Sequence, residues 1–235
     1  MKQRTIHYIL TCKDGSRQTF DFIINISSME LVGNIPNRLP SWTRLDYHQC
    51  PNCPLDVLEH PYCPAAANLV SIVNSFESIP SYEEIHVEVI TDERIISQDT
   101  TAQTGISSMM GFVMATSGCP RTAFLKPMAR FHLVLANEEE TIYRAASMYL
   151  LAQYFLNKEG LKIDLELKGL ADLYKNVHIV NNSIAQRLQA ASQEDSSVNA
   201  LVLLDVRAWE LQFEIEDSLE KIRYLFALYL PPVSS

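Results

Sequence analysis

The sequence predicts an α+β fold: an N-terminal β-hairpin or small antiparallel sheet, a proline- and cysteine-rich irregular segment with helices, and an all-α C-terminal unit of three helices. Three observations predict it. The runs that predict strands, rich in β-branched and aromatic residues, lie within the first hundred positions. Prolines and cysteines concentrate between residues 33 and 64, and apolar residues recur at helical spacing after residue 138. We expect an α+β domain over 1–135 and a helical unit over 136–235, packed together as one compact body.

The first two strands are expected at residues 4–11 and 18–26, which are rich in β-branched and aromatic side chains. Asp14-Gly15 lies between them, and this dipeptide is typical of a hairpin turn. A third strand is predicted at 84–91, where apolar and polar residues alternate, and a short fourth at 94–98.

The segment 33–64 holds more than half of the eleven prolines, which predicts irregular backbone. A long irregular segment in a compact domain needs something to hold it in place. Helices are expected from Pro64 to about Phe76 and from about Thr104 to about Thr116, and Gly118 is a typical helix stop.

The C-terminal region predicts three helices with one apolar stripe each, separated by polar breaks. The first covers 138–157, with Asn137 as its N-cap, and the second contains Leu170 to Ile184. The third has the most regular stripe, formed by Leu201, Leu204, Ala208, Leu211, Ile215, Ser218, Ile222, Leu225 and Tyr229. These helices offer a surface for a protein partner or for homo-oligomerisation.

Four of the five cysteines, Cys50, Cys53, Cys63 and Cys119, are each followed by proline, whereas Cys12 is followed by lysine. A residue before proline is displaced from the helical region, so these four cysteines should lie in loops or at helix edges. Cys63 is expected to be the N-cap of a helix that begins at Pro64, where the helix dipole favours a thiolate.

Four thiols of this pattern predict a metal site, with zinc and an iron–sulfur cluster as the two open alternatives. The histidines close to the set, His48, His60 and His132, are possible additional ligands. The competing interpretation is four unligated cysteines in a tight core, because free cysteine is often buried.

A second alternative is a redox dithiol, because Cys50-Pro51-Asn52-Cys53 matches the C-P-x-C pair of glutaredoxin-like proteins. That pair normally follows a buried strand in a βαβ unit, and the residues before Cys50 do not resemble such a strand. Residues 117–132 form the one local basic stretch, which we expect to neutralise the charge of a four-thiolate site.

The formal charge of −9 argues against general affinity for nucleic acid or anionic membranes. The N-terminus has no apolar signal region and no apolar run is long enough to span a bilayer, so we expect a cytoplasmic protein. No phosphate-binding loop or hydrolase signature is present, so the sequence assigns no catalytic residue and no substrate.

The motifs CPNCP at 50–54, HPYCP at 60–64 and SGCP at 117–120 resemble those of an uncharacterised family of bacterial proteins. That resemblance implies no activity. From the residues we expect a metal-containing binding or regulatory module with a structural four-cysteine site. The alternative is a redox enzyme or sensor that uses an iron–sulfur cluster or the Cys50/Cys53 dithiol.

Overall fold

A computed structural model of the chain describes residues 2–76, 79–190, 195–213 and 215–231, without the side chains at 207, 209–213, 215 and 216. The first part forms an antiparallel sheet in the order β3-β2-β1-β4-β5. Its strands are β1 (Gln3–Cys12), β2 (Arg17–Asn25), β3 (Glu30–Leu31), β4 (Glu84–Ile90) and β5 (Ile95–Thr101). The predicted hairpin and the strands near 84 and 94 are confirmed, and the two-residue β3 was not predicted because it is too short to show a period.

The hairpin forms where the Asp-Gly pair allows a tight turn. Gly15 has a φ of 84°, which glycine adopts at little cost, and its N–H donates to the Cys12 carbonyl at 3.0 Å. Alternate residues of β1, including Tyr8 and Leu10, are buried, as are Phe22 and Ile24 of β2. This period of two places one face of the sheet against helices.

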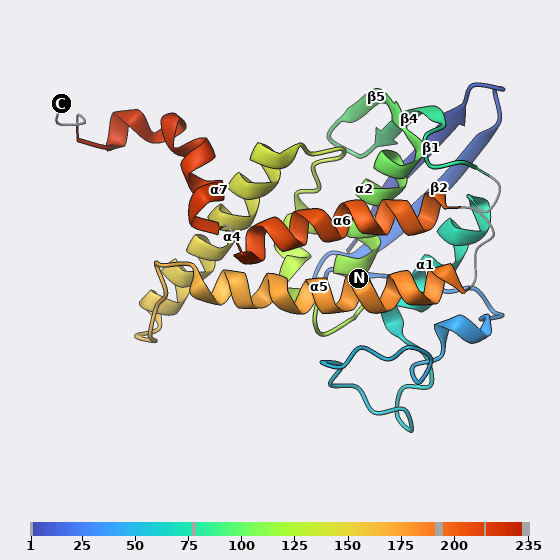
Figure 1. The fold of residues 1–235 in the computed structure, drawn as a ribbon, viewed down its shortest axis with the longest axis horizontal. Coiled ribbons are helices and arrows are strands. Elements are labelled where there is room, and N and C mark those ends of the chain that lie inside the picture. Colours follow the sequence, from blue (N-terminus) through green and yellow to red (C-terminus); the bar gives the residue numbers. More distant parts are fainter. Residues whose placement is uncertain (1, 77–78, 191–194, 214, 232–235) are drawn as a thin grey trace.

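The remaining chain is mainly helical (Figure 1). The described α-helices are α1 (Pro64–Ser75), α2 (Ala102–Thr116), α3 (Lys126–Arg130), α4 (Glu138–Lys158), α5 (Lys168–Gln189), α6 (Ser196–Phe213) and α7 (Ile215–Ile222). Short 3₁₀ turns are η1 (Ser41–Thr43), η2 (Ala123–Leu125) and η3 (Arg223–Tyr229). Asn137 caps α4 with the predicted geometry, because its side chain accepts from the Glu140 N–H at 2.9 Å and Glu140 bonds back.

The helices form two layers over the sheet. Helix α2 packs on the sheet and beside α1, α6 packs on α2, and α5 packs on α6 (Figure 1), so that Ile184 and Leu201 share one core with Tyr8 and Met109. Gly105 allows α2 to approach β4, since a Cβ there would lie 3.0 Å from side-chain atoms of Ile85 and Val87. The predicted division of the chain at residue 135 remains a prediction.

The expected single helix over the third stripe is wrong beyond Ile222. The described chain has α6, α7 and then the 3₁₀ segment η3, which extends away from the body (Figure 1). Ser218 and Ile222 are buried as the stripe predicts, but Leu225 is 53% exposed and Tyr229 is 85% exposed. The side chains of Leu211 and Ile215 lie outside the described residues. Of the helices described, none combines the length and apolar character needed to cross a bilayer.

Candidate functional site: four buried thiols

All four Cys-Pro cysteines lie in turns or at a helix start, as predicted from the proline that follows each. In the first turn the Cys53 N–H donates to the Cys50 carbonyl at 2.9 Å, and Pro51 supplies the φ that such a turn requires. Asn52 ties this turn to the rest of the protein. Its Nδ2 lies 2.8 Å from Oδ1 of Asn176 on α5, and its carbonyl accepts from Arg121 Nε at 2.6 Å.

Cys63 is the N-cap of α1 with Pro64 at the first helical position, which confirms the predicted geometry. Its own N–H donates to the Thr43 carbonyl at 2.8 Å, and its carbonyl accepts from Ala67 N–H at 2.9 Å. The thiol makes no capping hydrogen bond of ideal geometry, but the Ala66 N–H lies close enough to favour its thiolate.

Cys119 follows the end of α2, where Gly118 has a φ of 87° and stops the helix as predicted. The Thr122 N–H donates to the Cys119 carbonyl at 3.2 Å, and the N–H groups of Arg121 and Thr122, with the Thr122 hydroxyl, favour the Cys119 thiolate. In both the Cys63 and the Cys119 turn, therefore, N–H groups that follow the proline favour the thiolate of the cysteine that precedes it. N–H groups directed at sulfur are typical of metal-bound thiolates.

The four sulfurs belong to one electrostatic neighbourhood. Burial raises the pKa of Cys50 and Cys119, and it raises that of Cys63 to about 11. Neighbouring thiols raise these values further: Cys119 and Cys53 act on Cys50, Cys119 and Cys50 act on Cys63, and Cys53 acts on Cys119. Without a metal, Cys50, Cys63 and Cys119 are therefore neutral at pH 7, and a bound cation would displace their protons.

Arg187 of α5 is the residue that the sequence analysis missed. It is fully buried, and its guanidinium donates to the main-chain carbonyls of Trp42 at 2.8 Å, Arg44 at 2.6 Å and Leu45 at 3.2 Å. Its charge lowers the pKa of both Cys50 and Cys63, and within the described part of the chain its Nε has no hydrogen-bond partner.

The only sequence signal for this role is one arginine at a position of α5 where an amphipathic helix would bury an apolar side chain. From the sequence we expected residues 117–132 to supply the neutralising charge instead. There only Arg121 reaches the site, because Lys126 pairs with Glu30 at 2.8 Å and Arg130 lies over the Phe131 ring.

The possible histidine ligands lie elsewhere. His48 and His60 are exposed on the irregular segment, and His132 bonds to the Tyr8 hydroxyl. Cys12 lies on the buried face of β1, and all five cysteines are free. Among the residues that the structure describes, no three His, Cys, Asp or Glu side chains are close enough to hold a single metal ion as they stand.

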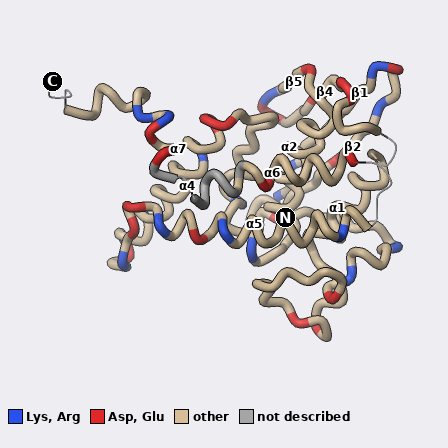
Figure 2. Tube along the Cα trace, viewed as in Figure 1, with Lys and Arg blue, Asp and Glu red and all other residues tan. Residues whose placement is uncertain are grey.

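The site is built on loops around an antiparallel sheet, so it lacks the βαβ unit that the glutaredoxin-like alternative requires. Charged residues of both signs are interspersed along the described chain (Figure 2), with acidic positions on the irregular segment. Fold and site together define an α+β protein in which four buried or half-buried thiols gather beside a buried arginine.

The comparison with family models identifies the chain more narrowly. Residues 6–227 match the family described as a domain of unknown function, DUF6901. The match covers nearly the whole chain, so the protein belongs to this family, in agreement with the resemblance to an uncharacterised family. Neither the curated proteins nor the solved structures include a significant match.

Proposed function

We propose that the protein is a metal-containing binding or regulatory protein in which Cys50, Cys53, Cys63 and Cys119 hold an iron–sulfur cluster. The observation that carries the proposal is the mutual influence of four thiols that arrive from three separate segments. At Cys63 and Cys119 the N–H groups that follow the proline also favour the thiolate, as hydrogen bonds to sulfur do at iron–sulfur clusters.

The surrounding charge also supports a metal centre. Arg187 is a buried cation for which, among the described residues, no carboxylate lies within ion-pair distance. A buried charge is costly unless it is compensated. Four thiolates on a cluster leave net negative charge, which Arg187 would offset, and N–H groups and nearby charge are the groups by which proteins tune such clusters.

The spacing of the thiols favours a cluster over zinc. A tetrahedral zinc site with Zn–S bonds of about 2.3 Å needs sulfurs roughly 3.8 Å apart. Among the described residues, no three His, Cys, Asp or Glu side chains are close enough to hold one ion, whereas a four-iron cluster binds each thiolate to a different iron and spaces them more widely. Cluster binding would fix the irregular segment to the end of α2 and to α5.

The test is anaerobic purification followed by measurement of iron, acid-labile sulfide, zinc and visible absorption. We expect iron and sulfide in equal amounts with a band near roughly 400 nm, and their loss in Cys50→Ser and Cys119→Ser. Cys12→Ser is the matched control, since Cys12 is buried outside the set and should leave metal content unchanged.

One equivalent of zinc without iron would overturn the cluster. Loss of metal only in Cys12→Ser would overturn the assignment of ligands. A metal-free protein that forms a Cys50–Cys53 disulfide on mild oxidation would overturn the proposal in favour of the redox dithiol.

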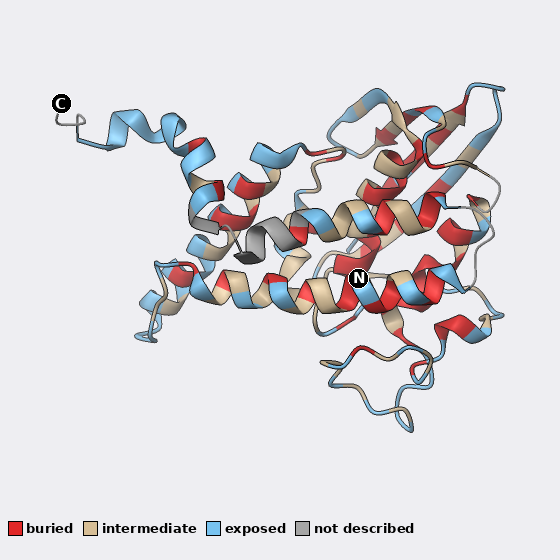
Figure 3. Cartoon of the chain, in the orientation of Figure 1, coloured by how far each residue is buried: buried red, intermediate tan, exposed pale blue. Residues whose placement is uncertain are grey.

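A second proposal concerns partners: we infer that the chain self-associates through its C-terminal segment and α4. Leu228 is 99% exposed and Tyr229 is 85% exposed on η3, which projects from the body (Figures 1 and 3). The outer face of α4 exposes Leu151 and Phe155, at 56% and 58%. A projecting apolar segment and an apolar helix face on the same chain favour exchange between two copies.

A further inference from the structure

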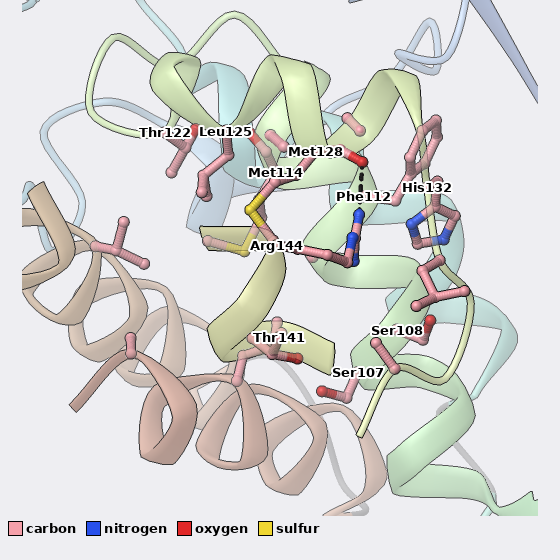
Figure 4. A pocket seen from close by; sticks show the side chains of 18 of the residues that line it. Ser107, Ser108, Phe112, Met114, Thr122, Leu125, Met128, His132, Thr141 and Arg144 are labelled. Carbon is pink, nitrogen blue, oxygen red and sulfur yellow. Dashed lines mark hydrogen bonds between the residues drawn. The ribbon is translucent and has the colours of Figure 1, made fainter. Parts of the chain in front are cut away.

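A second site candidate lies apart from the thiols, in a cavity of about 150 Å³ lined by residues of α2 to α6. Its lining is mainly apolar and includes Phe112 and Met114 (Figure 4), together with Val177 and Leu204. Pockets of this kind, apolar with a few converging polar groups, are the usual form of small-molecule sites.

Arg144 brings a positive charge into this cavity from α4 (Figure 4). Its Nη2 donates to the carbonyls of Met128 at 2.8 Å and Phe131 at 3.2 Å, and in the described part of the chain its Nε and Nη1 have no hydrogen-bond partner. No carboxylate of a described residue forms an ion pair with it. Burial lowers the pKa of Arg144, but a guanidinium remains charged at neutral pH.

Two hydroxyls in the cavity wall lack a good partner. The buried Tyr174 hydroxyl has the Met128 sulfur at 3.9 Å, and thioether sulfur is a weak acceptor. The Ser107 hydroxyl is buried without a hydrogen bond to any described residue. Buried polar groups are normally satisfied, so these two donors point to a ligand or water.

The cavity lining holds no carboxylate, although Glu140 of the same helix, outside the lining, raises the pKa of Arg144. His132 lies deep in the protein but retains accessible surface because it lines the cavity, and burial lowers its pKa to about 3. It is therefore neutral at pH 7. Among the described residues that line the cavity, Arg144 is therefore the one that is charged at pH 7.

We propose that the cavity binds a small monocarboxylate with a compact apolar body, about the size of benzoate. Its carboxylate would accept from Arg144 and from the Tyr174 hydroxyl, and its ring would occupy the apolar wall at Val177 and Leu204. A cavity of this volume accommodates a benzene-sized molecule. A dianion is disfavoured because one guanidinium cannot compensate two buried charges, and a purely apolar ligand would leave the hydroxyls unpaired.

The experiment measures binding of benzoate to the full chain by calorimetric titration, with benzamide as the uncharged isostere. We expect benzoate to bind at least tenfold more tightly than benzamide, and Arg144→Gln to weaken benzoate by at least tenfold. Arg17→Gln removes an exposed positive charge from β2 and should leave binding unchanged. Val177→Phe fills the cavity wall and should abolish binding while the chain remains folded.

The proposal is overturned if benzoate does not bind, if benzamide binds equally well, or if the cavity-filling variant keeps its affinity. If Arg144→Gln fails to fold, the comparison of benzoate with benzamide on the unmodified chain decides the role of the charge. Metal analysis has no part in these outcomes, so this inference and the cluster proposal can fail independently.

Discussion

Replacing Arg187 with methionine tests whether this buried cation organises the thiol site. Methionine is an unbranched apolar side chain that removes the charge, the donors and the end of the arginine side chain. The carbonyls of Trp42, Arg44 and Leu45 then lose their partner. Arg44 is an exposed residue, whereas Trp42 and Leu45 are buried.

The expected magnitude follows from those two buried acceptors. Each buried group left without a partner costs about 1–3 kcal/mol, and the release of a buried guanidinium returns part of its desolvation penalty. We expect a net loss of about 3 kcal/mol in the free energy of unfolding. For a chain of this size that corresponds to a fall in melting temperature of roughly 6–12 °C.

The measurement is thermal and urea unfolding of metal-free protein, with Lys175→Met as the matched control. Lys175 is an exposed basic residue on the same helix, so this variant removes the same charge without touching the carbonyls. A loss below about 1 kcal/mol, or one no larger than that of the control, would refute the assigned role of Arg187.

The same variant should also change metal retention. Arg187 lowers the pKa of Cys50 and Cys63, so without it protons compete better with the metal for those sulfurs. The pH at which metal is lost should therefore rise. An unchanged pH of metal loss would contradict an electrostatic contact between Arg187 and the bound thiolates.

Three further predictions concern pH, packing and association. Metal-free protein should lose about 3 kcal/mol of stability as pH rises from about 9 to 11, because the pKa of the Cys63 thiol is the ordinary 9.0 in the unfolded chain and about 11 in the folded protein; urea unfolding at several pH values should show a smaller loss in Cys63→Ala. Gly105→Val should lower the urea midpoint by an amount equivalent to about 1–3 kcal/mol, because its Cβ would meet Ile85 and Val87 at 3.0 Å, and an unchanged midpoint would contradict that close approach. Leu228→Asp should lower the sedimentation coefficient at high protein concentration if η3 joins two copies, and equal values for variant and wild type would rule out that contact.

The sequence predicted those parts of the fold in which local pattern and tertiary packing agree. Buried positions of β1 and β2 alternate as their residues do, and α1 begins at Pro64 as expected. The predicted buried helix from Leu201 to Tyr229 was wrong at its C-terminal end. Helical spacing shows which side chains could share a face, but it does not show whether a partner surface exists to cover them.

Of the candidate site, only the set of cysteines could be predicted from the sequence. The Cys-Pro pairs identified which residues to examine, because proline acts on its immediate neighbour. Arg187 could not be found in this way, since its hydrogen bonds reach carbonyls more than 140 positions earlier in the chain. The cavity could not be predicted from the sequence either, because it is formed only where α2, α4 and α5 pack.

Thr122 joins the two proposed sites. Its hydroxyl donates to the Met114 carbonyl at 2.6 Å and favours the Cys119 thiolate, and both Thr122 and Met114 line the cavity. A ligand that shifts this wall would therefore change the hydrogen bonding at Cys119, and by linkage a change at the thiols would alter affinity for the ligand. If both proposals hold, benzoate should perturb the visible spectrum of the metal-loaded protein, and Thr122→Val should weaken that perturbation more than it weakens binding. A spectrum that is unaffected by saturating benzoate would mean that the two sites share a wall but no energetic coupling.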